Sequence, residues 1–247
     1  MLKLKVIACD VLNREISYLA SRSKCFIDVT FLRQGLHDTP DKLGKELQAE
    51  IDKANSGFPY NHFNTAPDYD YIIVGYGLCG NGIVGVSSSK LPMVIPRGHD
   101  CITMLLGSKE LFAKYFDEYP GTYWFSSGWI ERAWQPSKKR YEAAYKKYLE
   151  KYGEENAEYL MEMEQSWLRD YKRAGLISWE CLDNYSHYCE FTRESARFLN
   201  WDYKEFNGSS SMLERMLNGI FEEKEVLVVP PGKKVVPSFK EDIIKIE

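Results

Sequence analysis

Short apolar runs alternate with amphipathic segments through the first half of the chain, and this alternation restricts the fold more than any other feature. The apolar runs have the length of strands and lie at 4–9, 25–32, 70–77, 91–96 and 121–130. The segments between them repeat apolar residues every three or four positions, which predicts helices at 11–22, 41–54 and 101–116. Strands separated by helices form βαβ units. We therefore expect an α/β fold with a mostly parallel sheet flanked by helices.

The second half begins with a different pattern. Residues 137–174 carry nine basic and eight acidic residues, which is typical of solvated helix faces. Four tyrosines share one helix face in this segment: Tyr141, Tyr145, Tyr148 and Tyr152. We expect a helical hairpin broken near Gly153, and a helical insertion at about 137–190 within a single α/β domain covering 1–247. A second small domain from about residue 175 is the alternative.

Composition excludes several classes of protein. The chain has 247 residues, of which 44% are hydrophobic and 28% charged, enough for a large core. Its net charge of -4 argues against nucleic acid and anionic membranes as partners. It has no apolar run long enough to span a bilayer and no signal peptide at the start, so we expect a cytoplasmic protein. Its six cysteines are then expected to be free thiols or metal ligands.

Three cysteines each follow a separate apolar run. Cys9, Cys79 and Cys101 come after the first, third and fourth runs. Because the carboxyl ends of parallel strands meet at one edge, where α/β proteins bind ligands, we expect the three thiols to gather there. Thiolates bind zinc or an iron–sulfur cluster, and an imidazole could complete the site. No pair has zinc-finger spacing, so a metal-free catalytic thiol and inert core thiols remain open.

Polar residues surround the third of these cysteines. Arg97 is a candidate for binding an anionic group, and His99 for a metal ligand or a general acid/base. Asp100 would orient a histidine, or cap a helix that begins at Cys101. We take His99, Arg97 and Asp100 as the catalytic candidates.

Further candidates would bind substrate. The turn "GYGLCGNG" supplies Gly77 and Gly80, whose backbone N–H groups could face an anion, although its spacing differs from the dinucleotide-binding pattern. His37, Gly128 and Trp129 complete this set. A second metal site is conceivable in "CLDNYSHYC", where chance proximity is favoured because the spacing matches no known zinc pattern. Its three residues are Cys181, His187 and Cys189.

Several of these segments resemble one family. "IACDVLNREI", "QGLHDTPDKL", "VGYGLCGNGIVG", "IPRGHDCITMLLGSKE", "GTYWFSSGWIE" and "VLVVPPG" are similar to the family called domain of unknown function 1638. Members of that family accompany corrinoid-dependent methyl-transfer systems of anaerobes. The resemblance therefore implies a role in one-carbon metabolism, with a corrinoid or methyltransferase protein as a partner.

These observations together lead to one expectation of function. We expect a cytoplasmic protein with a three-cysteine metal or cluster site that acts on a small molecule in one-carbon or corrinoid-linked methyl metabolism. Two alternatives stay open. One is a non-enzymatic metal-binding accessory protein of a methyltransferase system, and the other is a metal-free, cysteine-dependent enzyme.

Overall fold

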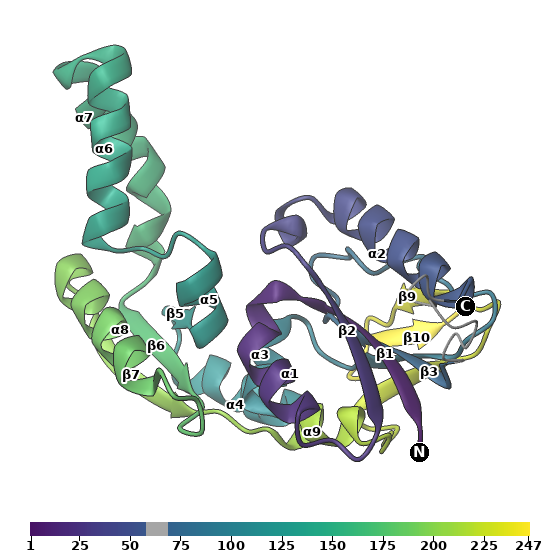
Figure 1. Ribbon diagram of the computed structural model, residues 1–247. Coiled ribbons are helices and arrows are strands. Elements are labelled where there is room, and N and C mark those ends of the chain that lie inside the picture. Colours follow the sequence, from purple (N-terminus) through teal and green to yellow (C-terminus); the bar gives the residue numbers. More distant parts are fainter. Residues whose placement is uncertain (58–68) are drawn as a thin grey trace. The chain divides into compact units, whose positions relative to one another are not determined.

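The computed structural model describes residues 1–57 and 69–247, and the chain divides into two compact units (Figure 1). Unit 1 comprises residues 1–113 and 209–247, and unit 2 comprises residues 114–208. The single α/β domain covering 1–247 stays a prediction. The expected fold class is confirmed, since a mostly parallel sheet flanked by helices forms the centre of the fold.

Unit 1 is built on a five-stranded sheet with the order β2-β1-β3-β4-β8. The first four strands are parallel, and the last pairs antiparallel with β4. The strands are β1 (Lys3–Cys9), β2 (Phe26–Leu32), β3 (Tyr71–Gly75), β4 (Met93–Pro96) and β8 (Val226–Val229). Nearly every residue of β1, β3 and β4 is buried, which explains why these strands are continuous apolar runs.

Helices cover this sheet. They are α1 (Asn13–Ala20), α2 (Pro40–Asn55), α3 (Cys101–Leu106) and α9 (Ser211–Leu217), with short 3-10 turns η1 (Asp10–Leu12) and η2 (Leu36–Asp38). Helix α2 buries Leu43, Leu47, Ile51 and Ala54, so the apolar spacing in the sequence corresponds to the face that packs. Two short strands, β9 (Val235–Pro237) and β10 (Ile244–Ile246), form an antiparallel pair near the C-terminus.

Unit 2 contains a second parallel sheet with the order β5-β6-β7. Its strands are β5 (Thr122–Phe125), β6 (Arg173–Ser178) and β7 (Asp202–Asn207), and its helices include α5 (Ser127–Arg132) and α8 (Tyr185–Leu199). Phe125, Ala174, Leu176 and Tyr188 lie in its core. Strand β6 falls inside the segment 137–190 that we expected to be a helical insertion, so only part of that segment is helical.

The helical part of the insertion is a hairpin. Helices α6 (Lys138–Tyr152) and α7 (Glu154–Gln165) lie side by side and extend away from the sheet of unit 2 (Figure 1), before the 3-10 turn η3 (Ser166–Asp170). They meet at Gly153, whose φ of +78° confirms the predicted break. The tyrosine stripe lies on a helix that buries no residue, although Tyr141 and Tyr145 stack and the Tyr148 hydroxyl donates to Glu164.

The chain leaves unit 1 after Ala113 and, on its return, contacts the residues that precede helix α4 (Lys109–Glu118). Helix α4 begins just after Gly107, and the returning chain reaches unit 1 at Ser209. The Ser209 N–H donates to the Leu105 carbonyl at 3.1 Å. A Cβ atom on Gly107 would lie 2.6 Å from the Ser209 Cβ, so only glycine permits this close approach.

Candidate functional site

The carboxyl ends of β1 and β3 bring a thiol and a phenol together. The two strands pair in register up to Ala8 and Gly75, so Cys9 and Tyr76 are the next neighbours across the sheet. Both side chains are buried, with 8% of Cys9 and 2% of Tyr76 exposed. The Tyr76 hydroxyl has no hydrogen-bond partner among the described residues, and burial, then the charge of Cys9, raises its pKa. Sequence analysis missed Tyr76 because it continues an apolar strand and no motif distinguishes its hydroxyl.

The loops after β3 and β4 continue side by side beyond the strands. Leu78 N–H donates to the Gly98 carbonyl and Cys79 N–H to the His99 carbonyl, both at 2.8 Å. A Cβ on Gly77 would lie 2.6 Å from the Asp100 amide nitrogen, so the close approach requires glycine at this position. These contacts hold Cys79 beside the loop that carries His99 and Asp100.

The turn that carries Cys79 has an uncommon backbone. Cys79, Gly80 and Asn81 have φ values of +46°, +62° and +72°. The left-handed region costs a non-glycine residue about 1–2 kcal/mol. Such strain in a non-glycine residue is typical of functional sites, where the surrounding structure maintains it.

The surroundings of the two thiols favour their protonated forms. Burial raises the pKa of the Cys9 thiol. Burial, then the charge of Asp100, then the charge of Cys9 raise the pKa of Cys79 to about 12. The pKa of Tyr76 is also raised, first by burial and then by the charges of Cys9 and Cys79. Cys9, Tyr76 and Cys79 therefore form a cluster within electrostatic reach of one another.

Asp100 caps helix α3. Its Oδ1 accepts a hydrogen bond from the Ile102 N–H at 3.0 Å, which confirms the predicted N-cap. Burial raises the pKa of this carboxyl group, and opposing effects come from backbone hydrogen bonds and from the charges of His99 and His37. The two histidines therefore lie near Asp100, with His99 exposed and His37 Nε2 3.3 Å from Asp38 Oδ1. A catalytic role for Asp100 or His99 and a substrate-binding role for His37 stay predictions.

The third predicted metal ligand is less closely involved. Cys101 is the first residue of α3 and is 8% exposed. Across residues 1–57 and 69–247, no group of three or more His, Cys, Asp or Glu side chains is placed to hold a metal ion. The structure thus brings Cys9 and Cys79 together without a preformed three-ligand centre, and the three-cysteine site stays a prediction.

Arg97 binds the C-terminal part of unit 1. Its buried guanidinium donates from Nε to the Glu223 carbonyl at 2.8 Å. One terminal nitrogen donates to the carbonyls of Asp242 and Ile244 at 3.0 and 2.7 Å. These bonds direct the guanidinium toward the backbone around β10, so the geometry favours a structural role over the anion-binding role that we expected.

The remaining candidates lie in unit 2. Gly128 and Trp129 belong to α5, where the Ser126 hydroxyl accepts the Trp129 N–H at 3.3 Å. Their predicted role in substrate binding stays untested. The suggested second metal site does not assemble among the described residues. Cys181 and His187 are exposed, whereas Cys189 is buried and its thiol interacts with the hydroxyls of Tyr185 and Tyr203.

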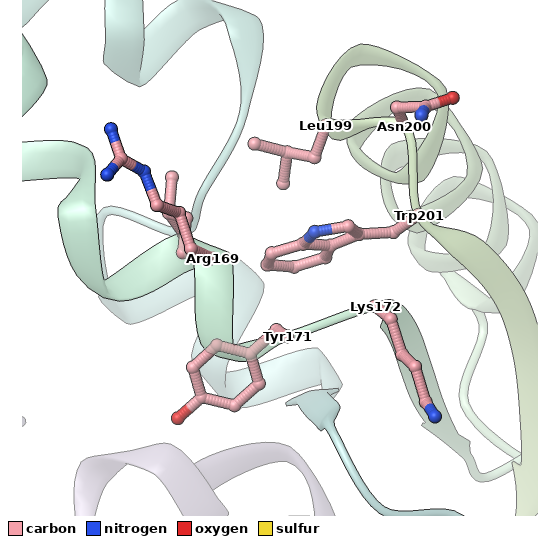
Figure 2. Close-up of a pocket in the computed structure, with 7 residues that line it drawn as sticks. Arg169, Tyr171, Lys172, Leu199, Asn200 and Trp201 are labelled. Carbon is pink, nitrogen blue, oxygen red and sulfur yellow. The ribbon is translucent and has the colours of Figure 1, made fainter.

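Unit 2 also has a shallow pocket of about 310 Å³ (Figure 2). Trp201 and Tyr171 form its aromatic part, and the other lining residues are Leu168, Arg169, Lys172, Leu199 and Asn200. Lys172 precedes β6 and Trp201 precedes β7, so the pocket lies at the amino edge of this parallel sheet. Ligands of α/β proteins bind at the opposite, carboxyl edge, and we therefore place the candidate site in unit 1.

Fold and site together define an α/β protein with two neighbouring thiols, buried Cys9 and half-buried Cys79, at the carboxyl edge of a parallel sheet. The chain belongs to the family described as "Protein of unknown function (DUF1638)", whose sequence model matches residues 31–217. Every predicted site residue except Cys9 lies within the match. No curated protein and no solved structure matches the chain. In the described part of the chain, no helix is both long enough and apolar enough to cross a membrane.

Proposed function

We propose that the carboxyl edge of unit 1 binds a thiophilic metal ion, or an iron–sulfur cluster, through Cys9, Cys79 and Cys101. The observation that carries the proposal is the pair formed by Cys9 and Cys79. Cys9 ends β1 and Cys79 lies in the loop after the neighbouring strand β3, close enough for the charge of Cys9 to raise the pKa of Cys79. Paired thiols are the ligands that zinc and iron–sulfur clusters prefer.

The backbone supports Cys101 as the third ligand. Cys79 N–H is bonded to the carbonyl of His99, only two residues before Cys101. Sites of this kind commonly take their final geometry when the metal binds, because thiols must lose their protons first. His99 or His37 then serves as a fourth ligand or as a general acid/base near Asp100.

The substrate class follows from the resemblance described above. We place the substrate among small molecules of one-carbon or corrinoid-linked methyl metabolism, with a corrinoid or methyltransferase protein as the partner. A thiophilic metal at this edge would supply a Lewis acid with an open coordination position.

The non-enzymatic form of the proposal is a metal-binding accessory protein of a methyltransferase. Fast loss of metal to a chelator favours the accessory protein, and slow loss favours a resident cofactor.

A metal-free dithiol is the second candidate. It is favoured by the finding that the described residues contain the thiol pair without a preformed third ligand. Such a pair would exchange with a disulfide, so that a Cys9–Cys79 disulfide forms as the partner disulfide is reduced to two thiols.

Metal analysis of anaerobically purified protein tests the proposal. We expect stoichiometric zinc or iron in the wild type and at least a tenfold loss of metal affinity in Cys9→Ser, Cys79→Ser and Cys101→Ser. Cys181→Ser is the matched control, because that thiol is exposed and lies in unit 2. Full metal content in Cys9→Ser and Cys79→Ser contradicts the proposal. A metal-free wild type whose disulfide exchange needs Cys9 and Cys79 but not Cys101 supports the dithiol.

A further inference from the structure

The helical hairpin of unit 2 has little of its surface buried. Helix α6 buries no residue over its 15 positions, and α7 buries Ala157 and Met161. The hairpin extends away from the sheet of its own unit (Figure 1). Helices of this length are marginal in water unless an amphipathic face packs against another part of a protein. A further partner would therefore stabilise the hairpin.

The two helices of the hairpin carry opposite charges. Helix α6 has six basic and two acidic residues, whereas α7 has five glutamates and no basic residue. An ion pair of 3.7 Å between Arg140 and Glu164 joins the helices, and the other lysines and glutamates of both helices are exposed. Helix α6 of one copy is thus complementary in charge to α7 of a second copy, and such complementarity orients association.

Each helix presents an exposed stripe whose members recur at every fourth position, so that they share one helix face. The α6 stripe consists of Ala143, Lys147 and Lys151, and the α7 stripe consists of Glu155, Tyr159 and Met163. All six residues are exposed, Tyr159 by 63% and Met163 by 57%. Large apolar side chains that are exposed side by side are typical of a surface that contacts another protein.

The two stripes are symmetric about Gly153, the single residue between the helices. Their members lie two, six and ten residues before it and after it. Because α6 and α7 lie side by side and antiparallel, residues equally far from Gly153 lie at about the same height. A two-fold axis along the hairpin keeps these heights and places α6 of one copy antiparallel to α7 of the other. The opposed residues are then Lys151 with Glu155, Lys147 with Tyr159, and Ala143 with Met163.

Each of these three opposed pairs is chemically complementary. Lysine and glutamate attract each other through their charges. A lysine ammonium is attracted to the face of a tyrosine ring, and the lysine stem covers apolar surface. Alanine leaves space for methionine, whose flexible side chain fills irregular gaps. A two-fold axis makes every contact twice, so the two copies would cover both stripes of each hairpin.

We infer that two copies of this chain associate through their hairpins, with the α6 stripe of each copy on the α7 stripe of the other. The inference uses unit 2 alone and is independent of the thiols of unit 1. Lys147, Lys151 and Glu155 form no ion pair among the residues that the structure describes. The Lys151 ammonium lies 4.9 Å from the centre of the Tyr152 ring, a contact that does not neutralise its charge.

Charge reversal at the pair nearest Gly153 tests the inference. In Lys151→Glu and in Glu155→Lys, each alone, like charges would face each other at both contacts. We expect sedimentation velocity to show a dimer of twice the 28.7 kDa chain for the wild type, and a dissociation constant at least tenfold higher for each variant. An equal mixture of the two variants restores opposite charges at both contacts of the mixed dimer. We expect this mixture to associate about as tightly as the wild type, which no effect within one chain can produce.

Lys146→Glu is the matched control, because Lys146 is exposed on α6 but lies outside the stripe. It should leave association unchanged. Tyr159→Ser tests the apolar part of the contact, and we expect at least tenfold weaker association. Circular dichroism checks that each variant stays helical, as expected for exposed positions. A wild type with the mass of one chain at every concentration overturns the inference. A dimer that the charge variants do not weaken, or that their mixture does not restore, overturns it as well.

Discussion

At the scale of single residues, the ionisation of Cys79 makes the candidate site accessible to measurement. Burial and the Asp100 charge raise its pKa from 9.0 to about 12. Because the thiolate is the nucleophile, we expect the rate of alkylation of Cys79 by iodoacetamide to keep increasing between pH 9 and about pH 12. Peptide mapping by mass spectrometry measures this rate. A rate that is already constant above pH 9 contradicts the environment described here.

A substitution can remove the charge of Asp100 and still keep the hydrogen bond with which this residue caps helix α3. Asn caps helices as well as Asp does, so Asp100→Asn keeps the bond to Ile102 and deletes the largest charge effect on Cys79. We expect a lower Cys79 pKa and faster alkylation at pH 9. Asp100→Ala is the control for the helix cap, because it removes the capping oxygen as well as the charge. We expect it to lower the free energy of unfolding by about 1 kcal/mol. An unchanged alkylation rate in Asp100→Asn would show that burial alone raises the pKa.

Replacing Arg97 distinguishes a structural role of its guanidinium from a role in ligand binding. Its guanidinium donates to three backbone carbonyls, which would lose a charged donor in Arg97→Met. We expect unfolding free energy to fall by about 3 kcal/mol, measured by urea denaturation. The exposed Arg33 is the matched position, where the same substitution should change stability by less than about 0.5 kcal/mol. Equal effects at both positions would contradict the structural role.

At the scale of elements, the thiol pair depends on how closely two loops approach. Gly77→Ala would place a Cβ 2.6 Å from the Asp100 amide nitrogen, and backbone cannot move aside as a flexible side chain can. We expect the loops to separate, with a stability loss of about 1–3 kcal/mol and faster alkylation of Cys79. Gly85→Ala is the comparison, because its φ is +84° but its Cβ would meet nothing within 4 Å. It should cost stability without affecting the thiol.

Sequence analysis predicted those strands and helices that a local pattern of apolar residues marks. Buried parallel strands are apolar runs, and the rule that their carboxyl ends meet at one edge placed Cys9 and Cys79 in one cluster. Strand β6 was missed because a short run, "RAGLIS", follows a long charged helical segment. Strands β9 and β10 are three residues each, too short for a recognisable pattern.

Other features depend on contacts that sequence cannot show. The carbonyls that Arg97 binds lie 126 to 147 residues away along the chain, so the sequence does not show that the guanidinium already has partners. The motif "PRGHDC" was therefore interpreted as an anion-binding site. Tyr76 was overlooked for a related reason. Whether a hydroxyl has a partner depends on neighbours from other strands, and tyrosine at a strand end is ordinary in composition.

At the scale of the whole molecule, the candidate thiols and histidines all belong to unit 1. We therefore expect unit 1 to fold and to keep the slow alkylation of Cys79 when residues 114–208 are replaced by a short glycine–serine linker. The linker joins Ala113, within helix α4, to Ser209, which stays bonded to Leu105. Urea unfolding and peptide mapping provide the measurements. Loss of cooperative unfolding, or alkylation as fast as in the urea-unfolded chain, would show that unit 1 needs unit 2 to fold.

The meeting of Gly107 with Ser209 also has a consequence for how unit 1 is held together. Gly107 lies near the end of the first segment of unit 1 and Ser209 opens the second, so this contact fastens one segment to the other. A larger side chain at position 107 would push the returning backbone away, and the damage would start far from either thiol in the sequence.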